Sequence, residues 1–288
     1  MKNYFKKLKL SSKALLAVLI PTLLLTWISA YVVFAQSKLN FTNSSYEHLQ
    51  TLKNIQSQRV SEYFIDLEKT VDSISRLPII KDAIYEFQRA FEQLNDKSIT
   101  EKQTIDIKKF YKETFVNIFP EGDQKLLLNR FLPTSKEEKY LQYQYIINNP
   151  YPVGQKRNMH FADDGSEYDT IHRKYHETMR NLLSGMGFYN LYLINTKGDV
   201  IYSVTKGLDL GTNLVNGPYA DTNLAEAFDK VYSKGAANYT VLIDFKKYIA
   251  KYNQPTAFIS TDILNESNEF IGALVFQIDI EELNKLMT

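Results

Sequence analysis

The sequence of 288 residues contains no cysteine. This absence excludes disulfide bonds, thiolate zinc sites, iron–sulfur clusters and cysteine nucleophiles together. An excess of either charge is also lacking, because 34 lysines and arginines stand against 33 aspartates and glutamates, so a broad nucleic-acid-binding surface is not expected. The hydrophobic content of 44% excludes a disordered chain and predicts one or two packed domains.

The short motifs of common enzyme classes are missing as well. There is no glycine-rich phosphate loop, no Gly-x-Ser-x-Gly turn and no His-Glu-x-x-His helix. The adjacent acidic residues Asp163 and Asp164, like Glu281 and Glu282, do not suggest a paired acid and base, because neighbouring side chains on a regular element point apart. We therefore expect a protein that is not an enzyme and that carries no cofactor.

A long apolar run lies near the N-terminus. No charged residue occurs from Ala14 to Ser37. This run exceeds the ~20 residues that a helix rising ~1.5 Å per residue needs to cross ~30 Å of hydrocarbon. A cleaved signal peptide is the alternative, but its apolar region is usually ~7–15 residues long and no clear Ala-x-Ala site follows here. We therefore predict a retained transmembrane helix over residues 14–37.

The charges around this run predict its orientation. The first 36 residues hold five lysines, all before the run, and no acidic residue. Because positively charged flanks stay in the cytoplasm, residues 1–13 are expected there and everything after about residue 37 is expected outside. No second apolar run approaches ~18 residues, so the chain is predicted to cross the membrane once.

An amphipathic helix is expected after the span. Apolar side chains between residues 46 and 77 step by three and four, which is helical spacing. They are Leu49, Leu52, Val60, Phe64, Leu67, Val71, Ile74 and Leu77. From Val60 onward the spacing resembles heptads, so this stripe could pair with its copy in a homodimer or pack on its own domain, and we favour the second. Pro78 ends this helix, and a new one is expected from Ile79.

Helical patterns continue as far as Gly187. Residues 139–147 and 168–186 have the apolar spacing of helices, and Gly185 and Gly187 stop the second of them. Residues 95–136 alternate short helical patterns with polar breaks. We therefore predict that residues 38–187 form a helical stalk and a helical subdomain.

After Gly187 the apolar period changes from ~3.6 to ~2, which indicates β-strands. The predicted strands are 188–195, 200–205, 239–245, 256–264 and 270–279. A helix over 221–233 is expected between the second and third strands, and a short helix over 280–287 after the last. The predicted fold class is α+β, with residues 188–288 forming a five-stranded antiparallel sheet. A helix and loops cover one face of this sheet and leave the other free to line a pocket.

Four stretches carry a resemblance to a known family. They are NPYPVGQK (149–156), DDGSEYDTIHRKYH (163–176), GFYNLYLINTKGDVIYSV (187–204) and LDLGTNLVNGPYADTNLAEAF (208–228). Together with the order of the elements, they resemble the Cache sensor region, a PAS-like extracytoplasmic module of bacterial transmembrane receptors. The likeness is greatest to methyl-accepting chemotaxis proteins, and related regions occur on histidine kinases and cyclases.

The resemblance implies the extracytoplasmic, ligand-sensing region of a chemoreceptor-type signal transduction protein in the bacterial inner membrane, with a small-molecule ligand. In two-module members the chain continues past the position of Thr288 into a second module, a second span and a cytoplasmic signalling bundle. We therefore expect either a fragment or truncated product, or an output partner on another chain. The alternative is a membrane-anchored structural or interaction protein whose PAS-like module is unoccupied.

Aromatic side chains with one or two carboxylates are the expected lining of such a pocket. Asp221 either meets a ligand amine or caps the following helix, and we favour the cap. Asp244 precedes aromatic residues that could form a cage for a cationic ligand. The candidate ligand-binding residues are Tyr202, Tyr219, Asp221, Asp244, Tyr248, Tyr252 and Phe258. The Tyr, Arg, Trp and Asp arrangement of amino-acid-binding Cache members is not found between residues 189 and 252, so that mode of recognition is not predicted.

Two histidines raise the question of a metal. His172 and His176 are four residues apart on a predicted helix, so both imidazoles lie on one face where they could share an ion. Two ligands alone do not make a structural zinc site, and the nearby cations Arg173 and Lys174 oppose metal binding. We therefore expect surface or hydrogen-bonding histidines and no metal, with a pair that titrates near pH 6.5 as a further alternative.

Overall fold

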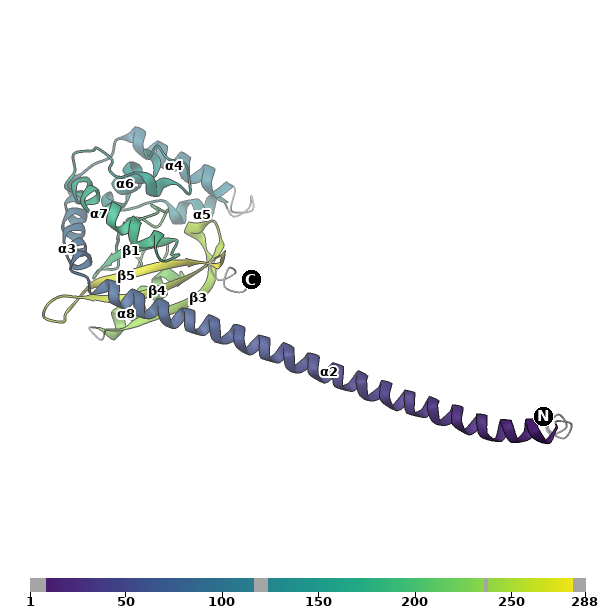
Figure 1. Ribbon diagram of the computed structural model, residues 1–288. Coiled ribbons are helices and arrows are strands. Elements are labelled where there is room, and N and C mark those ends of the chain that lie inside the picture. Colours follow the sequence, from purple (N-terminus) through teal and green to yellow (C-terminus); the bar gives the residue numbers. More distant parts are fainter. Residues whose placement is uncertain (1–8, 117–123, 236–237, 282–288) are drawn as a thin grey trace. The chain divides into compact units, whose positions relative to one another are not determined.

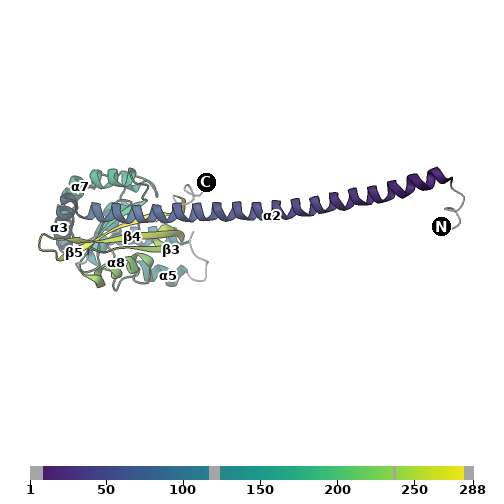
Figure 2. The same ribbon diagram turned by 60° about the horizontal axis from the view of Figure 1, so that its bottom comes forward.

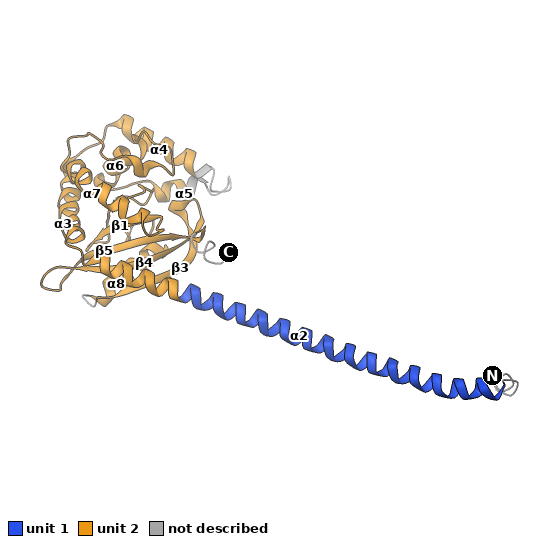
Figure 3. Ribbon diagram, viewed as in Figure 1, with its two compact units in different colours: residues 1–61 blue, residues 62–288 orange. Residues whose placement is uncertain are grey.

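The structure is a computed structural model that describes residues 9–116, 124–235 and 238–281. The chain divides into two compact units, residues 1–61 and residues 62–288 (Figure 3). Helix α2 (Leu10–Ser75) supplies almost all of the described part of the first unit and continues into the second. The helical subdomain and the sheet both lie in the second unit.

The N-terminal part of α2 contains the predicted span. Among the described residues, α2 is the one helix long and apolar enough to cross a membrane. Pro21 interrupts its ladder of backbone hydrogen bonds, and the Thr22 hydroxyl donates to the carbonyls of Val18 and Leu19, each at 3.0 Å. Polar groups satisfied within the helix are what a bilayer requires. This part of α2 is therefore a candidate membrane span.

The second unit is built on a five-stranded antiparallel sheet (Figure 1). The strands are β1 (Asn190–Asn195), β2 (Val200–Ser203), β3 (Thr240–Tyr248), β4 (Gln254–Leu264) and β5 (Phe270–Asp279). Their spatial order is β2-β1-β5-β4-β3, and every neighbouring pair is antiparallel. This order is that of a PAS-like sheet, so the predicted α+β class and the five predicted strands are confirmed.

Both faces of the sheet are covered, so the expectation of one free face is wrong. Helices α3 (Pro78–Gln93) and α7 (Glu167–Ser184) share one core with Leu191 and Leu193, and α8 (Asn223–Lys234) shares the other with Tyr192 (Figure 2). The reason is the composition of the central strands, because β1 is buried at every position and β5 at all but its ends. A strand apolar on both sides needs a layer on each.

The helical subdomain completes the second unit. It contains α4 (Glu101–Val116), α5 (Gln124–Phe131), α6 (Lys136–Gln142) and the π-helical turn η2 (Tyr143–Ile147). Helix α6 starts three residues earlier than predicted, because the Ser135 side chain caps it by accepting from the Glu138 amide. In α7 the Ser166 side chain does the same for the Asp169 amide.

Several helix boundaries test the sequence predictions. Helix α2 ends at Ser75 and α3 begins at Pro78, so the break at this proline is confirmed. Leu67, Val71 and Ile74 pack into their own unit, whereas Leu49 and Leu52 are exposed. The stripe therefore packs on its domain only in its C-terminal part.

Two further predictions concern the start of α8 and a short helix after β5. The predicted acidic cap of α8 is wrong, because α8 begins at Asn223 and its cap is Thr222, whose hydroxyl accepts from the Ala225 amide. Thr222 is one residue nearer to the helix than Asp221, and only its side chain reaches the free amide of the first turn. The predicted short helix over 280–287 falls largely on residues outside the described ones.

Candidate functional site

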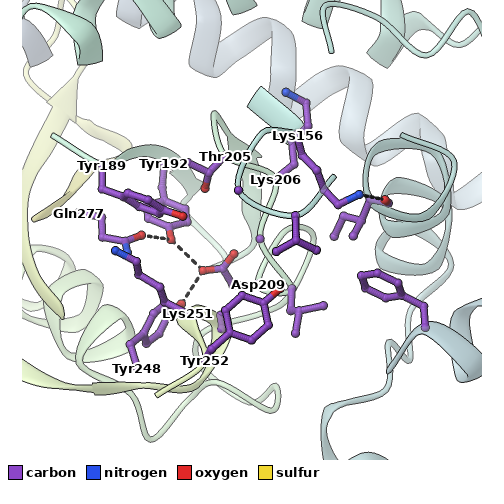
Figure 4. Close-up of a pocket in the computed structure, with 17 residues that line it drawn as sticks. Lys156, Tyr189, Tyr192, Thr205, Lys206, Asp209, Tyr248, Lys251, Tyr252 and Gln277 are labelled. Carbon is purple, nitrogen blue, oxygen red and sulfur yellow. Dashed lines mark hydrogen bonds between the residues drawn. The ribbon is translucent and has the colours of Figure 1, made fainter. Parts of the chain in front are cut away.

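A partly open cavity of about 50 Å³ lies at one end of the sheet in the second unit (Figure 4). It lies where β1 begins and where β3 and β5 end, since these three ends meet in the antiparallel arrangement. The loop over 205–209, which follows β2, and the turn over 250–252, which follows β3, line it. Its polar and aromatic walls include Lys156, Tyr189, Tyr192, Lys206, Asp209, Tyr248, Lys251, Tyr252 and Gln277.

Asp209 is the acidic residue of this cavity. It is 1% exposed, and its Oδ2 accepts hydrogen bonds from Tyr248 at 2.6 Å and from Tyr192 at 2.9 Å. Burial raises the pKa of the Asp209 carboxyl above its ordinary value, and the two tyrosine hydroxyls oppose that rise. The other carboxylate oxygen, Oδ1, is buried and makes no hydrogen bond to any described residue. The cavity thus contains a buried acceptor without a donor.

Glycine at position 207 makes this arrangement possible. A Cβ atom on Gly207 would lie 2.7 Å from Asp209 Oδ1, which is closer than real contacts allow. The Gly207 carbonyl also accepts from the Leu210 amide at 3.1 Å, so the loop turns tightly around the carboxylate. The local sequence Gly-Leu-Asp-Leu therefore turns Asp209 inward between two buried leucines, Leu208 and Leu210.

Gln277 on β5 is linked to Asp209 through a tyrosine. The Tyr192 hydroxyl lies 2.9 Å from both Asp209 Oδ2 and Gln277 Oε1. Gln277 is 1% exposed, and its amide nitrogen Nε2 has no hydrogen-bond partner among the described residues. A buried amide donor without a partner costs free energy of the order of 1–3 kcal/mol. The cavity therefore offers one unpaired donor as well as one unpaired acceptor.

The three lysines of the cavity all have partners in the chain. Lys156 Nζ donates to the carbonyls of Ile146 and Tyr151, and burial lowers its pKa. Lys251 forms an ion pair with Asp279.

Lys206 is the most deeply buried of the three lysines. Its Nζ lies 3.3 Å from the Val204 carbonyl and 3.2 Å from His176 Nε2. Burial holds the pKa of Lys206 well below its usual range, and the charges of Arg180 and Arg157 add to that effect. This amine is therefore a weak counter-charge for any group in the cavity.

Tyr189 forms the rim between two cations. Lys251 Nζ lies 3.6 Å from the centre of its ring, and the Arg157 guanidinium lies 5.3 Å from it. Arg157 also donates to the Tyr189 carbonyl at 3.1 Å. Cations over an aromatic face are attracted by its quadrupole, so Lys251, which lines the cavity, and Arg157 both help to hold the Tyr189 ring in place.

The structure places four of the seven predicted ligand-binding residues in or near the cavity. Tyr248 and Tyr252 line it. Phe258 packs edge-to-face on Tyr248 with ring centres 5.0 Å apart, and the Tyr219 ring centre lies 6.5 Å from that of Tyr248. Phe258 and Tyr219 therefore support the tyrosine that binds Asp209 and do not themselves face the cavity.

The other three predicted residues lie elsewhere. Tyr202 lies in the core on the opposite side of the sheet, where its hydroxyl meets His176 Nδ1 at 2.7 Å. Asp221 is exposed and pairs with Arg130 at 2.8 Å. Asp244 is exposed and accepts from the amide of its neighbour Phe245 at 2.7 Å. None of the three lines the cavity.

Asp209, Tyr192 and Gln277 line the cavity but are not among the residues predicted from the sequence. Only Asp209 could have been recognised from the sequence, because it lies between two leucines and two residues after a glycine. An aspartate in a solvated loop would have polar neighbours. Tyr192 and Gln277 alternate with apolar residues on strands and resemble ordinary core positions.

His172 and His176 are buried and hydrogen-bonded in the core. His172 Nδ1 lies 2.7 Å from the His160 carbonyl and His176 Nε2 lies 2.7 Å from the Arg157 carbonyl, so each ring must donate there. The two rings stack with centres 4.3 Å apart. Within the described residues, no group of three or more histidines and carboxylates is placed to hold a metal.

Burial also decides whether these histidines titrate near neutral pH. It lowers the pKa of His176 to about 2 and that of His172 well below the usual value, and the charge of Lys206 adds to both shifts. Titration of this pair near pH 6.5 is therefore wrong, and the hydrogen-bonding interpretation is confirmed, although the rings lie in the core and not on the surface.

Comparison with known proteins gives a likeness to solved structures and none to families or curated proteins. No family model matches the chain, and no curated protein matches it. Among solved structures, the sensor domain of the histidine kinase DctB from V. cholerae is similar, with 16% sequence identity and a TM-score of 0.31. The match covers 58% of this chain and 58% of that one, so the chain spans less than two thirds of the structure it matches. The fold class itself follows from the strand order and the antiparallel pairing.

Proposed function

We propose that this chain is the extracytoplasmic ligand-sensing region of a membrane-anchored signal transduction protein of the chemoreceptor type. Residues 14–37 anchor it, and the sheet module binds a small molecule in the cavity around Asp209. The role is one of binding and not of catalysis, since the cavity residues form no nucleophile and base pair. The observation that carries the proposal is the pair of unpaired polar atoms, Asp209 Oδ1 and Gln277 Nε2, on residues that line one cavity.

Two further features support sensing. Two short segments, the loop over 205–209 and the turn over 250–252, line the cavity, and a ligand that contacts both can draw them together. The last turns of α2 pack in the core of the same unit as the sheet. A ligand that favours one arrangement of these segments would bias a two-state displacement of α2, which leads back to the membrane. Pairing of α2 with its copy in a homodimer is part of this proposal.

A ligand screen with a cavity-filling variant tests the proposed function. The full chain in lipid nanodiscs is melted by circular dichroism in the presence of amino acids, amines, carboxylates, nucleobases and metal salts. A ligand at ~100 times its dissociation constant stabilises the folded state by ~2.7 kcal/mol, which corresponds to several degrees. The variant Ala250→Leu fills the cavity and should lose that shift. Ala220→Leu, which is half-buried outside the cavity, should keep it.

The alternative function is a structural or interaction protein with an unoccupied module. The small volume of the cavity, about 50 Å³, favours it, because drug-sized ligands need several hundred Å³. A screen in which no compound shifts the melting of the full chain supports this alternative and contradicts ligand sensing.

A further inference from the structure

Two complementary polar atoms of the cavity lie on side chains that share one hydroxyl group. The Tyr192 hydroxyl oxygen lies 2.9 Å from Asp209 Oδ2 and 2.9 Å from Gln277 Oε1, and its single hydrogen can be donated to one of these two acceptors at a time. Asp209 Oδ1 and Gln277 Nε2 are the remaining atoms of these two side chains, and both are buried without partners among the described residues (Figure 4). A group that donates to the first and accepts from the second would satisfy both.

The carboxylate of Asp209 also lacks a cationic partner among the described residues. Within the described residues Asp209 forms no ion pair, although three lysines line the same cavity. Lys251 is paired with Asp279, Lys156 donates to backbone carbonyls, and burial keeps the pKa of Lys206 low. A buried carboxylate with two tyrosine partners and no cation is stabilised most by a ligand that carries a positive charge.

The aromatic wall and the volume restrict the ligand further. Tyr192 and Tyr248 both bond to Asp209, and Tyr189 and Tyr252 complete the side of the cavity around it. Aromatic faces beside a carboxylate favour a cation. One water-sized position needs ~10–15 Å³, so a cavity of about 50 Å³ holds about three or four non-hydrogen atoms.

We propose that the cavity binds a small protonated primary amine with a nearby oxygen atom, an amino alcohol of about four non-hydrogen atoms. Its ammonium group donates to Asp209 Oδ1, and its oxygen accepts from Gln277 Nε2. This inference rests on the proposed function and adds the chemical class of the ligand. Asp209 supplies affinity through its charge, and Gln277 selects for the oxygen.

Three small probes of similar size test the two contacts separately. Ethanolamine hydrochloride carries both groups, n-propylamine hydrochloride lacks the oxygen, and ethylene glycol lacks the charge. Isothermal titration with the full chain in nanodiscs should give the tightest binding for ethanolamine. We expect about tenfold weaker binding for propylamine, which leaves Gln277 Nε2 unpaired, and at least about a hundredfold weaker binding for ethylene glycol.

Two variants, the first with a matched control, assign the contacts to residues. Asp209→Asn keeps the shape and removes the charge, and should weaken ethanolamine binding at least about tenfold. Asp221→Asn, the same change at an exposed aspartate, should leave it unchanged. Gln277→Met should bring the ratio between ethanolamine and propylamine close to one. A melting curve of each variant shows that it is folded.

The outcomes separate this inference from the proposed function. Equal ethanolamine binding by the native chain and by Asp209→Asn overturns the inference. So does a carboxylate, such as propionate, that binds in place of ethanolamine and is lost in Ala250→Leu, because the cavity then senses a ligand of another class. The absence of binding by any compound of the wider screen overturns the proposed function itself.

Discussion

Two buried polar regions of the sheet module differ in how completely they are paired. The histidine cluster contains His172, His176 and Tyr202, and the histidine nitrogens meet backbone carbonyls or the Tyr202 hydroxyl at 2.7 Å. The cavity around Asp209 is buried as deeply, yet it leaves an acceptor and a donor free. In the cluster only His172 Nε2 is free, and that atom belongs to a ring stacked on His176.

The difference teaches which buried polar groups hold the fold and which await a ligand. A group whose partners all come from the chain contributes to stability, and its loss leaves those partners unsatisfied. A polar group left unpaired beside a cavity lowers the stability of the empty protein. A ligand that pairs with this group restores that stability when it binds. Substitutions in the cluster should therefore change stability, and substitutions in the cavity should change binding.

The largest expected effect comes from the cluster. His176→Ala removes a packed ring and leaves the Arg157 carbonyl and the Tyr202 hydroxyl without their partner, so we expect a loss of about 3 kcal/mol in the free energy of unfolding. Denaturant titration of the full chain, followed by circular dichroism, measures it. His48→Ala, an exposed histidine on α2, should change stability by less than about 0.5 kcal/mol. A similar small loss for both variants contradicts the structural role of the cluster.

A second buried carboxylate tests whether an unpaired oxygen alone marks a binding site. Glu138 has one oxygen bonded to the Thr134 amide at 2.8 Å, and its Oε1 is buried and unpaired, but Glu138 does not line the cavity. Burial raises its pKa from 4.5 to about 7. The folded state therefore binds the Glu138 proton more tightly than the unfolded state does. The stability that this proton contributes is fully present below pH 4.5 and is lost as pH rises through about 7.

Glu138→Gln should remove that pH dependence. The amide keeps an acceptor for the Thr134 amide and carries no charge, so the variant should be more stable than the native chain at pH 8 by at most about 3 kcal/mol. Melting temperatures from pH 4 to pH 8 measure the effect, with Glu137→Gln as the neighbouring control. Ethanolamine binding should stay unchanged. A change in binding would contradict the rule that only free atoms beside the cavity matter.

The sequence predicted the elements well because their signals are local. All five strands follow from alternation and turn residues, and Pro78 predicted the break before α3. The face on which a strand residue lies depends on register, which is not local. Tyr202 pairs with Leu193 and so shares its face, opposite to Tyr192, after an irregularity between Leu193 and Ile194. This register places the predicted Tyr202 in the histidine cluster.

The site could be predicted only in part for the same reason. Tyr248 and Tyr252 were found because aromatic residues gather around the turn after β3. Asp221 and Asp244 were chosen as carboxylates near those aromatics, but both point into solvent. The carboxylate that lines the cavity, Asp209, comes from a different loop, and only the fold brings it to Tyr248.

The pH dependence of amine binding tests whether Asp209 is the group of the cavity that binds the ligand. Asp209 faces Tyr192 on β1, Tyr248 on β3 and Gln277 on β5, and lysines 156, 206 and 251 line the same space. Burial raises the pKa of Asp209, so as pH falls through that raised pKa the carboxylate takes up a proton and loses its attraction for an ammonium group. Affinity should then fall by up to about tenfold per pH unit.

Titration calorimetry with ethanolamine between pH 4 and pH 8 measures this dependence. Lys206 also lines the cavity, and its pKa is held well below its usual range, so Lys206→Met serves as the control and should keep the dependence. Asp209→Asn should abolish it. A profile that is flat in the native chain, or flat in Lys206→Met, contradicts the assignment to Asp209.

The smallest expected effect is a gain in stability on substitution of Asp209, whereas substitution in the histidine cluster should lower stability. In the empty chain, burial raises the pKa of Asp209, so stability is lost as pH rises through that raised pKa and is recovered as pH falls. Asp209→Asn removes the cost and should stabilise the ligand-free chain by about 1 kcal/mol at pH 8. Asp221→Asn, at an exposed ion pair, should change it by less than about 0.5 kcal/mol. Denaturant titration at pH 8 and pH 4 gives both values. If Asp209→Asn instead loses stability, as His176→Ala should, then Asp209 is a structural group and the contrast between the two regions fails.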